Sequence, residues 1–207
     1  MNTSEQNYKA IRKTAMELFR NRGFDNVTVK EICEASGVPR RSFYALFENK
    51  DQLILSYFDL NQELFLDVDS FTELMLLNDS YSKLLGIVSN YLDLLEKNGR
   101  NFLSQIFRIG TQDDQNILSV LASGMKDLSS QFIKECQEDG SVLNQTDPDL
   151  LWESLTTFLI GICYLWCCGE PFPLKETALS RFEDIIGTRP ELRKHHNDTL
   201  FLYHEKN

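Results

Sequence analysis

Apolar residues recur three and four positions apart along most of the chain, the spacing that places side chains on one face of an α-helix. In residues 5–22 this face consists of Tyr8, Ile11, Ala15, Leu18 and Phe19, and Gly23 closes the segment. The sequence shows no alternation typical of a β-strand, no internal repeat and no low-complexity tract. The pattern therefore predicts an all-α protein whose first helix spans residues 5–22.

Two short helices joined by a tight turn are predicted next. Thr28 and Glu31 have the spacing of a capping box, in which each side chain bonds an unpaired backbone N–H at a helix start. The helix that begins there is expected to end at Gly37, since glycine readily adopts the left-handed conformation. Pro39 suits the first position of the second helix, residues 39–47, because its φ is preset and it lacks an N–H. The inward side of the first helix is expected to carry Val29, Ile32 and Ala35.

The second of these helices has one apolar side and one basic, aromatic side. Phe43 and Phe47 stand four residues apart and are expected to point into a small core. An Arg-Arg pair is often only a solvated face, but this pair directly follows the turn, on the helix that such motifs insert into the major groove. Arg can bind guanine edges with two hydrogen bonds, so the surface suits double-stranded DNA. It consists of Arg40, Arg41, Ser42 and Tyr44.

The rest of the chain continues the helical pattern. Asn49 is expected to cap a fourth helix, with Gln52 at its third position, and the pattern runs on past residue 60 as a stiff rod. Asp147 and Pro148 supply the cap and the first residue of a later, long helix. For the tail, residues 190–207, packing and fraying both remain open. The later helices are predicted at residues 70–77, 80–97, 100–110, 114–139, 148–168 and 174–186.

The helix at residues 148–168 is almost entirely apolar in its second half, so it needs cover on every side. Its apolar run, residues 158–168, is shorter than the roughly 20 residues of a membrane span, which favours a buried helix and no membrane. In a homodimer, the helix at residues 148–168 would be covered by the helix at residues 174–186 and by both of these helices from a second copy of the chain. The alternative is a monomer with a large core. The expected interface residues are Leu155, Phe158, Ile162, Ala178, Phe182 and Ile185.

Charge is distributed unevenly along the 207 residues, whose net charge is −10. Residues 1–50 contain nine basic and six acidic side chains, whereas residues 51–207 contain 12 basic and 25 acidic ones. The acidic part would be repelled by phosphate, so the chain is expected to meet DNA by its N-terminal end. The chain has five cysteines, and no charged segment followed by an apolar one is found at Met1. Together these features predict free thiols in the reducing cytoplasm.

The sequence contains few candidates for other chemistry. Cys163, Cys167 and Cys168 lie close together, and this suits either core packing or the sensing of a soft metal or an oxidant. Core packing is favoured, because no Lys, Arg or His lies nearby in the sequence to stabilise a thiolate. We find no Gly-x-Ser-x-Gly elbow, phosphate-binding glycine loop or His-Glu-x-x-His zinc pattern. We therefore expect neither an enzyme nor a cofactor or metal site.

Three stretches together resemble the TetR family of transcriptional regulators: the first helix with Gly23-Phe24, TVKEICEASGV, and SFYALFENKDQL. The resemblance covers residues 5–55. It implies a three-helix helix-turn-helix DNA-binding domain, residues 1–50, followed by a larger helical domain for effector binding and dimerisation, residues 51–207. Many members have a phosphate-contacting His where this chain has Leu46, so that contact is expected to be missing. The resemblance places at DNA Thr28, Arg40, Arg41, Ser42, Tyr44 and Lys50.

A broad apolar stripe follows the helix at residues 148–168, and the preceding helices offer similar surface. Such a stripe is ordinarily core, but the resemblance implies a cavity for a small molecule there. The helix contains no Lys or Arg, which favours a largely apolar effector over a multiply anionic one. The expected lining residues are Phe102, Ile106, Phe107, Met125, Trp152, Thr156, Leu159, Cys163 and Trp166.

These observations predict a ligand-responsive transcriptional regulator, most simply a repressor, that binds a palindromic operator as a homodimer and is released by a small effector. The alternative is a thiol- or metal-responsive sensor that acts through protein partners and uses its N-terminal helices only to bind them. Salt dependence separates the two, because each neutralised phosphate releases counterions. The operator, the effector and the sign of regulation are left open by the sequence.

Overall fold

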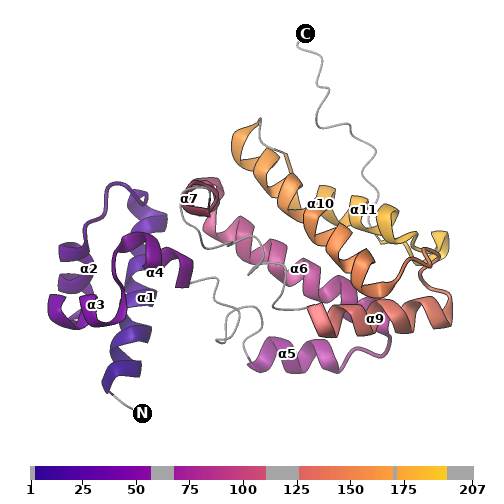
Figure 1. Ribbon diagram of the computed structural model, residues 1–207, viewed down its shortest axis with the longest axis horizontal. Helices are drawn as coiled ribbons and strands as arrows, with labels where there is room; N and C mark the ends of the chain where they lie inside the picture. Colours follow the sequence, from indigo (N-terminus) through magenta and orange to yellow (C-terminus); the bar gives the residue numbers. More distant parts are fainter. Residues whose placement is uncertain (1–2, 57–67, 111–125, 170–171, 195–207) are drawn as a thin grey trace, which may run out of the picture. The chain divides into compact units, whose positions relative to one another are not determined.

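The computed structural model describes residues 3–56, 68–110, 126–169 and 172–194, and its regular elements are helices (Figure 1). Within these ranges, β pairing is limited to one isolated bridge between Val142 and Thr188. The predicted all-α class is therefore confirmed. The chain packs as two compact units: an N-terminal unit, Met1–Leu64 with Asn98–Leu121, and a C-terminal unit, Phe65–Lys97 with Ala122–Asn207.

The N-terminal unit contains five described helices. They are α1 (Thr3–Arg22), α2 (Val29–Ser36), α3 (Arg40–Leu46), α4 (Lys50–Ser56) and α7 (Arg100–Gly110). Helices α2 and α3 pack on α1 and on each other, so that the first three helices share one small core. Its fully or almost fully buried side chains include Ile11, Ala15, Phe19, Val27, Ile32, Phe43 and Phe47. Helix α7 groups with this unit although it lies beyond residue 50, and the domain boundary expected at residue 50 stays a prediction.

Local signals fix the boundaries of α2 and α3. The capping box is present as predicted, and Gly37 ends α2 in the left-handed conformation, with φ 70° and ψ 13°. Two details were wrong. Pro39 is the N-cap of α3, with ψ 145°, because its backbone is still extended there, so the helix proper begins one residue later. Ala35 is exposed and Cys33 is buried in its place, since α2 turns a different edge toward α1.

Helix α4 begins as predicted. The Asn49 side chain accepts a hydrogen bond from the backbone N–H of Gln52 at 2.8 Å. The Gln52 side chain in turn accepts one from the backbone N–H of Glu48 at 2.6 Å. Leu53 and Ile54 are buried in the N-terminal unit. The expected continuation past residue 60 lies outside the described residues.

The C-terminal unit is built around a long apolar helix. Its described elements are α5 (Val68–Met75), α6 (Ser80–Asn98, whose last residue groups with the N-terminal unit), α9 (Lys126–Asp139), α10 (Pro148–Cys168), α11 (Leu174–Ile186) and the 3-10 turn η1 (Pro190–Leu192). The predicted bounds of α10 and α11 are confirmed, including the Asp147 cap and Pro148 at the first position. The first part of the helix expected at residues 114–139 lies outside the described residues.

Helix α10 packs between α9 and α11 (Figure 1). Its buried face comprises Leu151, Trp152, Leu155, Thr156, Leu159, Ile162, Cys163 and Trp166. By length and composition this helix could also cross a membrane, with a mean hydropathy of 1.5 over an 18-residue window that is 44% buried. A core helix of a globular protein meets the same criteria. The contacts with α9 and α11 support the prediction of a buried core helix.

Helix α11 is fixed to the unit at both of its ends. At its start the Lys175 ammonium pairs with Asp93 of α6 at 2.6 Å. Near its end Glu183, which is fully buried, accepts hydrogen bonds from the Tyr81 hydroxyl and from the backbone N–H of Lys194. Arg193 and Lys194 of the tail are therefore attached to α11 through Asp184 and Glu183, and residues 195–207 lie outside the described part.

Candidate nucleic-acid interface

Helix α3 presents a polar face because its apolar face is held in the core. Phe43 and Phe47 are 0% and 2% exposed. The Phe47 ring also stacks on Tyr8 of α1, with ring centroids 5.1 Å apart and planes 19° from parallel. A helix of only two turns is marginal by itself, so these aromatic contacts set its orientation.

The outer face of α3 combines exposed arginines with an aromatic hydroxyl. Arg40 and Arg41 are exposed, Tyr44 is 52% exposed and Ser42 is partly buried. Helix α3 contains no acidic residue, and neither arginine is in an ion pair with another described residue. Both guanidinium groups therefore remain available to an external anion. The structure thus brings together four of the six residues expected at DNA.

Thr28 lies at the start of α2, where its side chain is used within the protein. Its hydroxyl accepts a hydrogen bond from the backbone N–H of Glu31 at 3.2 Å and donates one to the Glu31 carboxylate at 2.7 Å. The carboxylate also accepts from the backbone N–H of Thr28 and pairs with Arg22 at 2.8 Å. These hydrogen bonds with Thr28 and Arg22 lower the pKa of Glu31 to about 2. The N-terminus of α2 is thereby fixed in place.

Lys50 has an internal role that sequence reasoning missed. Its ammonium donates hydrogen bonds to the backbone carbonyls of Phe24 and Val27, at 2.7 and 2.6 Å, and lies 4.3 Å from the centre of the Phe24 ring. Partial burial lowers its pKa. Lys50 therefore connects the start of α4 to the loop before α2. A contact from Lys50 to DNA stays a prediction.

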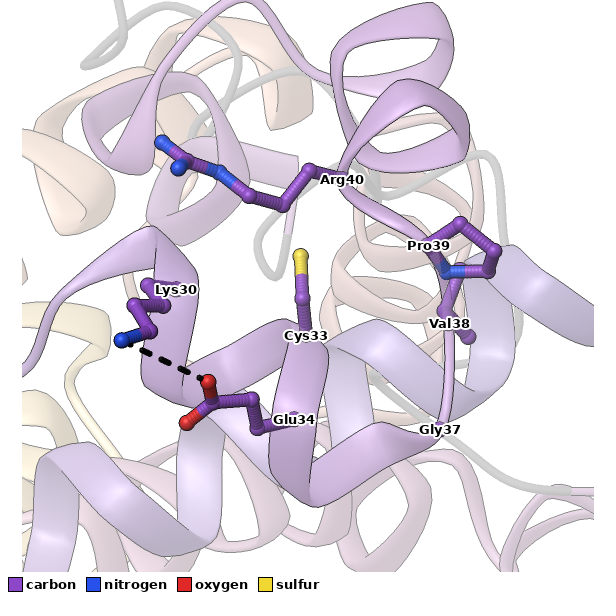
Figure 2. Close-up of a pocket in the computed structure, with 7 residues that line it drawn as sticks. All are labelled: Lys30, Cys33, Glu34, Gly37, Val38, Pro39 and Arg40. Atoms are coloured by element: carbon purple, nitrogen blue, oxygen red, sulfur yellow. Dashed lines mark ion pairs between the residues drawn. The ribbon is translucent and has the colours of Figure 1, made fainter.

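A groove of about 440 Å³ runs between α2 and the start of α3 (Figure 2). Figure 2 shows the Cys33 sulfur facing the space beneath Arg40, and Lys30 paired with Glu34 at 3.7 Å. Burial raises the pKa of the Cys33 thiol, and the nearby Arg40 partly opposes this. Lys30 was not among the residues expected at DNA, although its place two residues after the Thr28 cap puts it on the exposed side of α2.

Helix α7 is linked to the helices that position α3. The Arg108 guanidinium donates a hydrogen bond to Asp51 of α4 at 3.2 Å and lies 5.9 Å from the centre of the Phe24 ring. Just before α7, the side chain of Asn98, the last residue of α6, accepts a hydrogen bond from Arg20 of α1 at 3.0 Å. The helix-turn-helix is therefore attached to residues distant in the sequence through α1 and α4.

The residues expected to line an effector cavity fall into two groups. Phe102 and Ile106 are buried in the N-terminal unit with α7, where Phe107 is half-buried, and Met125 lies outside the described residues. The five members on α10 are buried in the C-terminal unit: Trp152, Thr156, Leu159, Cys163 and Trp166. The Thr156 hydroxyl donates to the Trp152 carbonyl of its own helix, so it is satisfied internally. The cavity stays a prediction.

The residues expected at a dimer interface also fall into two groups, one buried and one partly exposed. Four of them are buried inside the single chain, so their side chains already pack within it: Leu155, Ile162, Ala178 and Phe182. Phe158 and Ile185 keep part of their surface. The exposed side of α10 instead carries Glu153 and, beside it, an uncharged stripe at alternating spacings of four and three residues, composed of Leu150, Ser154, Thr157, Gly161 and Tyr164.

The described residues contain no group of three or more His, Cys, Asp or Glu that could hold a metal ion. The five cysteines are reduced, and three of them are buried.

The fold and the exposed face of α3 define a helix-turn-helix protein in which a small N-terminal unit precedes a helical C-terminal unit. Residues 11–57 match the family model of bacterial regulatory proteins, tetR family. The resemblance seen in the sequence is thereby confirmed. A comparison with curated protein sequences finds no match.

Solved structures of TetR-family and related regulators share the fold over most of their length. FadR of Thermus thermophilus, solved with lauroyl-CoA, is 20% identical with a TM-score of 0.63, covering 93% of this chain and 98% of its own. NemR of E. coli in its reduced form is 19% identical with a TM-score of 0.61, covering 88% and 98%. RolR with resorcinol is 18% identical with a TM-score of 0.60, covering 91% of each chain. At these identities the likeness is one of fold.

Proposed function

We propose that this regulator is a repressor that binds a palindromic operator as a homodimer and is released by a small, largely apolar effector. The observation that carries the proposal is the outer face of α3, where Arg40 and Arg41 are exposed and make no ion pair with the described residues. A basic helix after a tight turn fits the major groove, and its arginines can read guanine edges. Lys30 on α2, which is paired with Glu34, adds a third cation beside this face.

The decisive experiment selects DNA from a random pool with the purified protein and sequences what is recovered. A palindromic sequence with half-sites about one helical turn, roughly 34 Å, apart is expected. Its affinity should fall steeply between about 50 and 200 mM salt, because neutralised phosphates release counterions. No enriched sequence, or an affinity that salt leaves unchanged, would refute DNA binding and favour the protein-partner alternative.

The homodimer is proposed from the uncovered side of α10. The stripe from Leu150 to Tyr164 has the spacing of a helix-packing seam, and it is uncharged although the chain carries a net charge of −10. Small residues along it allow a second helix to approach closely, and a Cβ placed at Gly161 would meet no atom within 4 Å. A second copy of α10 and α11 fits this surface as one half of a four-helix interface.

Two leucines provide a matched test of the dimer. Leu150, on the stripe, and Leu143, in the loop before α10, are each 57% exposed. Leu150→Glu places like charges across a two-fold contact and should give monomers in sedimentation at micromolar concentration, whereas Leu143→Glu should behave as wild type. Glu near the start of a helix is favourable for folding, so the first variant should stay folded. Monomeric wild-type protein would contradict the proposal.

The effector is proposed to bind near the buried face of α10. This helix contains no Lys or Arg, so the site suits an apolar body with a few polar contacts. The ligands of the two similar structures, lauroyl-CoA and resorcinol, offer an acyl chain and a phenolic ring as starting probes. Both tryptophans of the chain, Trp152 and Trp166, lie on this face. Saturable quenching of their fluorescence should therefore report binding.

Release from DNA is proposed to follow from a difference in effector affinity between two arrangements of the helix-turn-helix. By linkage, the factor by which the effector weakens DNA binding equals the factor by which DNA weakens effector binding. The Arg108 to Asp51 pair, which joins α7 to α4, is a candidate contact in this coupling. A compound that quenches both tryptophans but leaves operator affinity unchanged would refute the switch.

A further inference from the structure

The groove between α2 and the start of α3 has an apolar lining between charged side chains. Cys33 and Val38 are only 6% and 4% exposed, and Pro39 beside them is exposed. These three residues are named the floor of the groove. The charged residues of the lining are all exposed: Lys30, Glu34 and Arg40. The proposed function uses Arg40 and Lys30 but gives the floor no role.

The side chains of the floor offer close contact but no strong hydrogen bond. Burial raises the pKa of the Cys33 thiol, which therefore stays neutral and behaves as a small hydrophobic group. In Figure 2 its sulfur lies between the Lys30 and Glu34 pair on the left and Val38 and Pro39 on the right. An apolar group that enters the groove of about 440 Å³ can therefore meet the sulfur directly.

The floor is continuous with the surface proposed to meet DNA. Arg40 belongs to both, because it lines the groove and is the first residue of α3. A recognition helix in the major groove brings base edges to the residues near its N-terminal end. The floor lies directly before that end, so a bound duplex would place base edges over it.

The bases differ in what they would present to the floor. In the major groove guanine, adenine and cytosine show polar atoms, and thymine adds a 5-methyl group, the one apolar group among them. A polar atom over the floor would lose water without gaining a hydrogen bond, which is unfavourable. The Glu34 carboxylate at the edge of the groove is paired with Lys30 at 3.7 Å. The floor therefore favours thymine.

We propose that the floor receives the 5-methyl group of one thymine in each operator half-site, beside the base pair that Arg40 contacts. Cys33 is then a residue that determines sequence specificity, through a contact without any covalent bond. The inference rests on the proposed function, because it requires that α3 enters the major groove. DNA binding does not require the methyl contact, so the inference can fail while the proposed function holds.

The first test changes only the DNA. Each thymine of the selected operator is replaced, symmetrically in both half-sites, by deoxyuridine, which lacks only the 5-methyl group. At one position the affinity in fluorescence anisotropy should fall roughly four-fold for each methyl removed, as expected for a buried group of this size. At that position 5-methylcytosine should bind more tightly than cytosine by a similar factor, since again only the methyl differs.

The second test changes the floor. Cys33→Ser places a hydroxyl where the thiol faces the groove, and should reduce the loss at that position to less than about two-fold while leaving other thymines unaffected. Cys33→Ala, which removes the sulfur, should act in the same direction. Cys136→Ser, at a buried cysteine of α9 in the C-terminal unit, is the control and should keep the full loss. Circular dichroism checks that each variant is folded.

Photocrosslinking locates the methyl group in the wild-type protein. 5-Iododeoxyuridine carries an iodine atom in place of the methyl of thymine, and irradiation should join it to the tryptic peptide of residues 31–40, which contains the whole floor. Mass spectrometry identifies the peptide.

Three results would overturn the inference: no deoxyuridine position that weakens binding, a loss that persists in both Cys33 variants, or a crosslink outside residues 31–40. An operator with steep salt dependence and no such thymine would leave the proposed repressor standing. If selection recovers no operator, the proposed function and this inference both fail.

Discussion

The two units of this protein are specified in different ways. In the N-terminal unit, short helices are bounded by local signals, such as the Thr28 and Glu31 box and the left-handed Gly37, around a core of aromatic residues. In the C-terminal unit, longer helices are joined by contacts between distant residues, such as Tyr81 with Glu183 and Asp93 with Lys175. The comparison indicates that the N-terminal unit depends on a small number of local interactions. Single changes there should therefore have large and separable effects.

The largest expected effect is on the core of the N-terminal unit. Phe43→Ala removes a fully buried ring and should lower the free energy of unfolding by about 3 to 5 kcal/mol. Arg41→Ala, on the exposed side of the same helix, is the control and should change it by less than about 0.5 kcal/mol. Urea unfolding followed by circular dichroism measures both. Equal effects of the two changes would show that α3 does not depend on its buried face.

Arg41→Ala should act on DNA binding rather than on folding. If the guanidinium reads a base edge, operator affinity should fall by about 1 to 3 kcal/mol, with unchanged unfolding. Lys134→Ala, which removes one exposed charge from α9 in the C-terminal unit, is the control for charge alone. Fluorescence anisotropy with the selected operator gives both affinities. The same loss for both variants would mean that the effect is general electrostatics.

Thr28→Ala tests how far the N-terminal unit relies on local caps. Loss of the hydroxyl leaves the Glu31 backbone N–H without its cap, which should cost about 0.5 to 2 kcal/mol. Thr157→Ala is a comparison in the C-terminal unit, because that exposed hydroxyl donates only to a carbonyl of its own helix. If Thr157→Ala proves the more destabilising in urea, the contrast between the units is wrong.

The smallest expected effect is a dependence on pH. The pKa of Glu31 is lowered to about 2 from an ordinary value of 4.5, so in this range the unfolded chain binds more protons than the folded one. The contribution of Glu31 is therefore complete above pH 4.5 and is lost as the pH falls toward 2. The difference in stability between wild type and Glu31→Gln should shrink over that window. A difference that is constant with pH would contradict the capping role of the carboxylate.

Sequence reasoning succeeded where the signal is local. The bounds of α10 and α11, the capping box and the inward Phe43 and Phe47 all follow from residues within one or two turns of each other. The exposed arginines of α3 follow from the same periodicity.

It failed where the outcome depends on distant packing. The burial of Cys33 instead of Ala35 depends on which edge of α2 meets α1. The internal bonds of Lys50 depend on a loop more than 20 residues earlier. Leu155 and Phe182, which were expected at a partner, are buried in their own chain, because periodicity does not distinguish two kinds of apolar contact; their role at an interface stays a prediction.

The placement of α7 also bears on how this protein is made and recombined. Arg108 of α7 and Asn98, the last residue of α6, bond to Asp51 and Arg20, which precede them by more than 40 positions. During synthesis, the first four helices leave the ribosome well before these partners do, so the N-terminal unit is completed late. A chimera that fuses residues 1–56 to the C-terminal part of another regulator would leave both contacts unmade. Residues 98–110 together with the helix-turn-helix are therefore the natural unit of exchange.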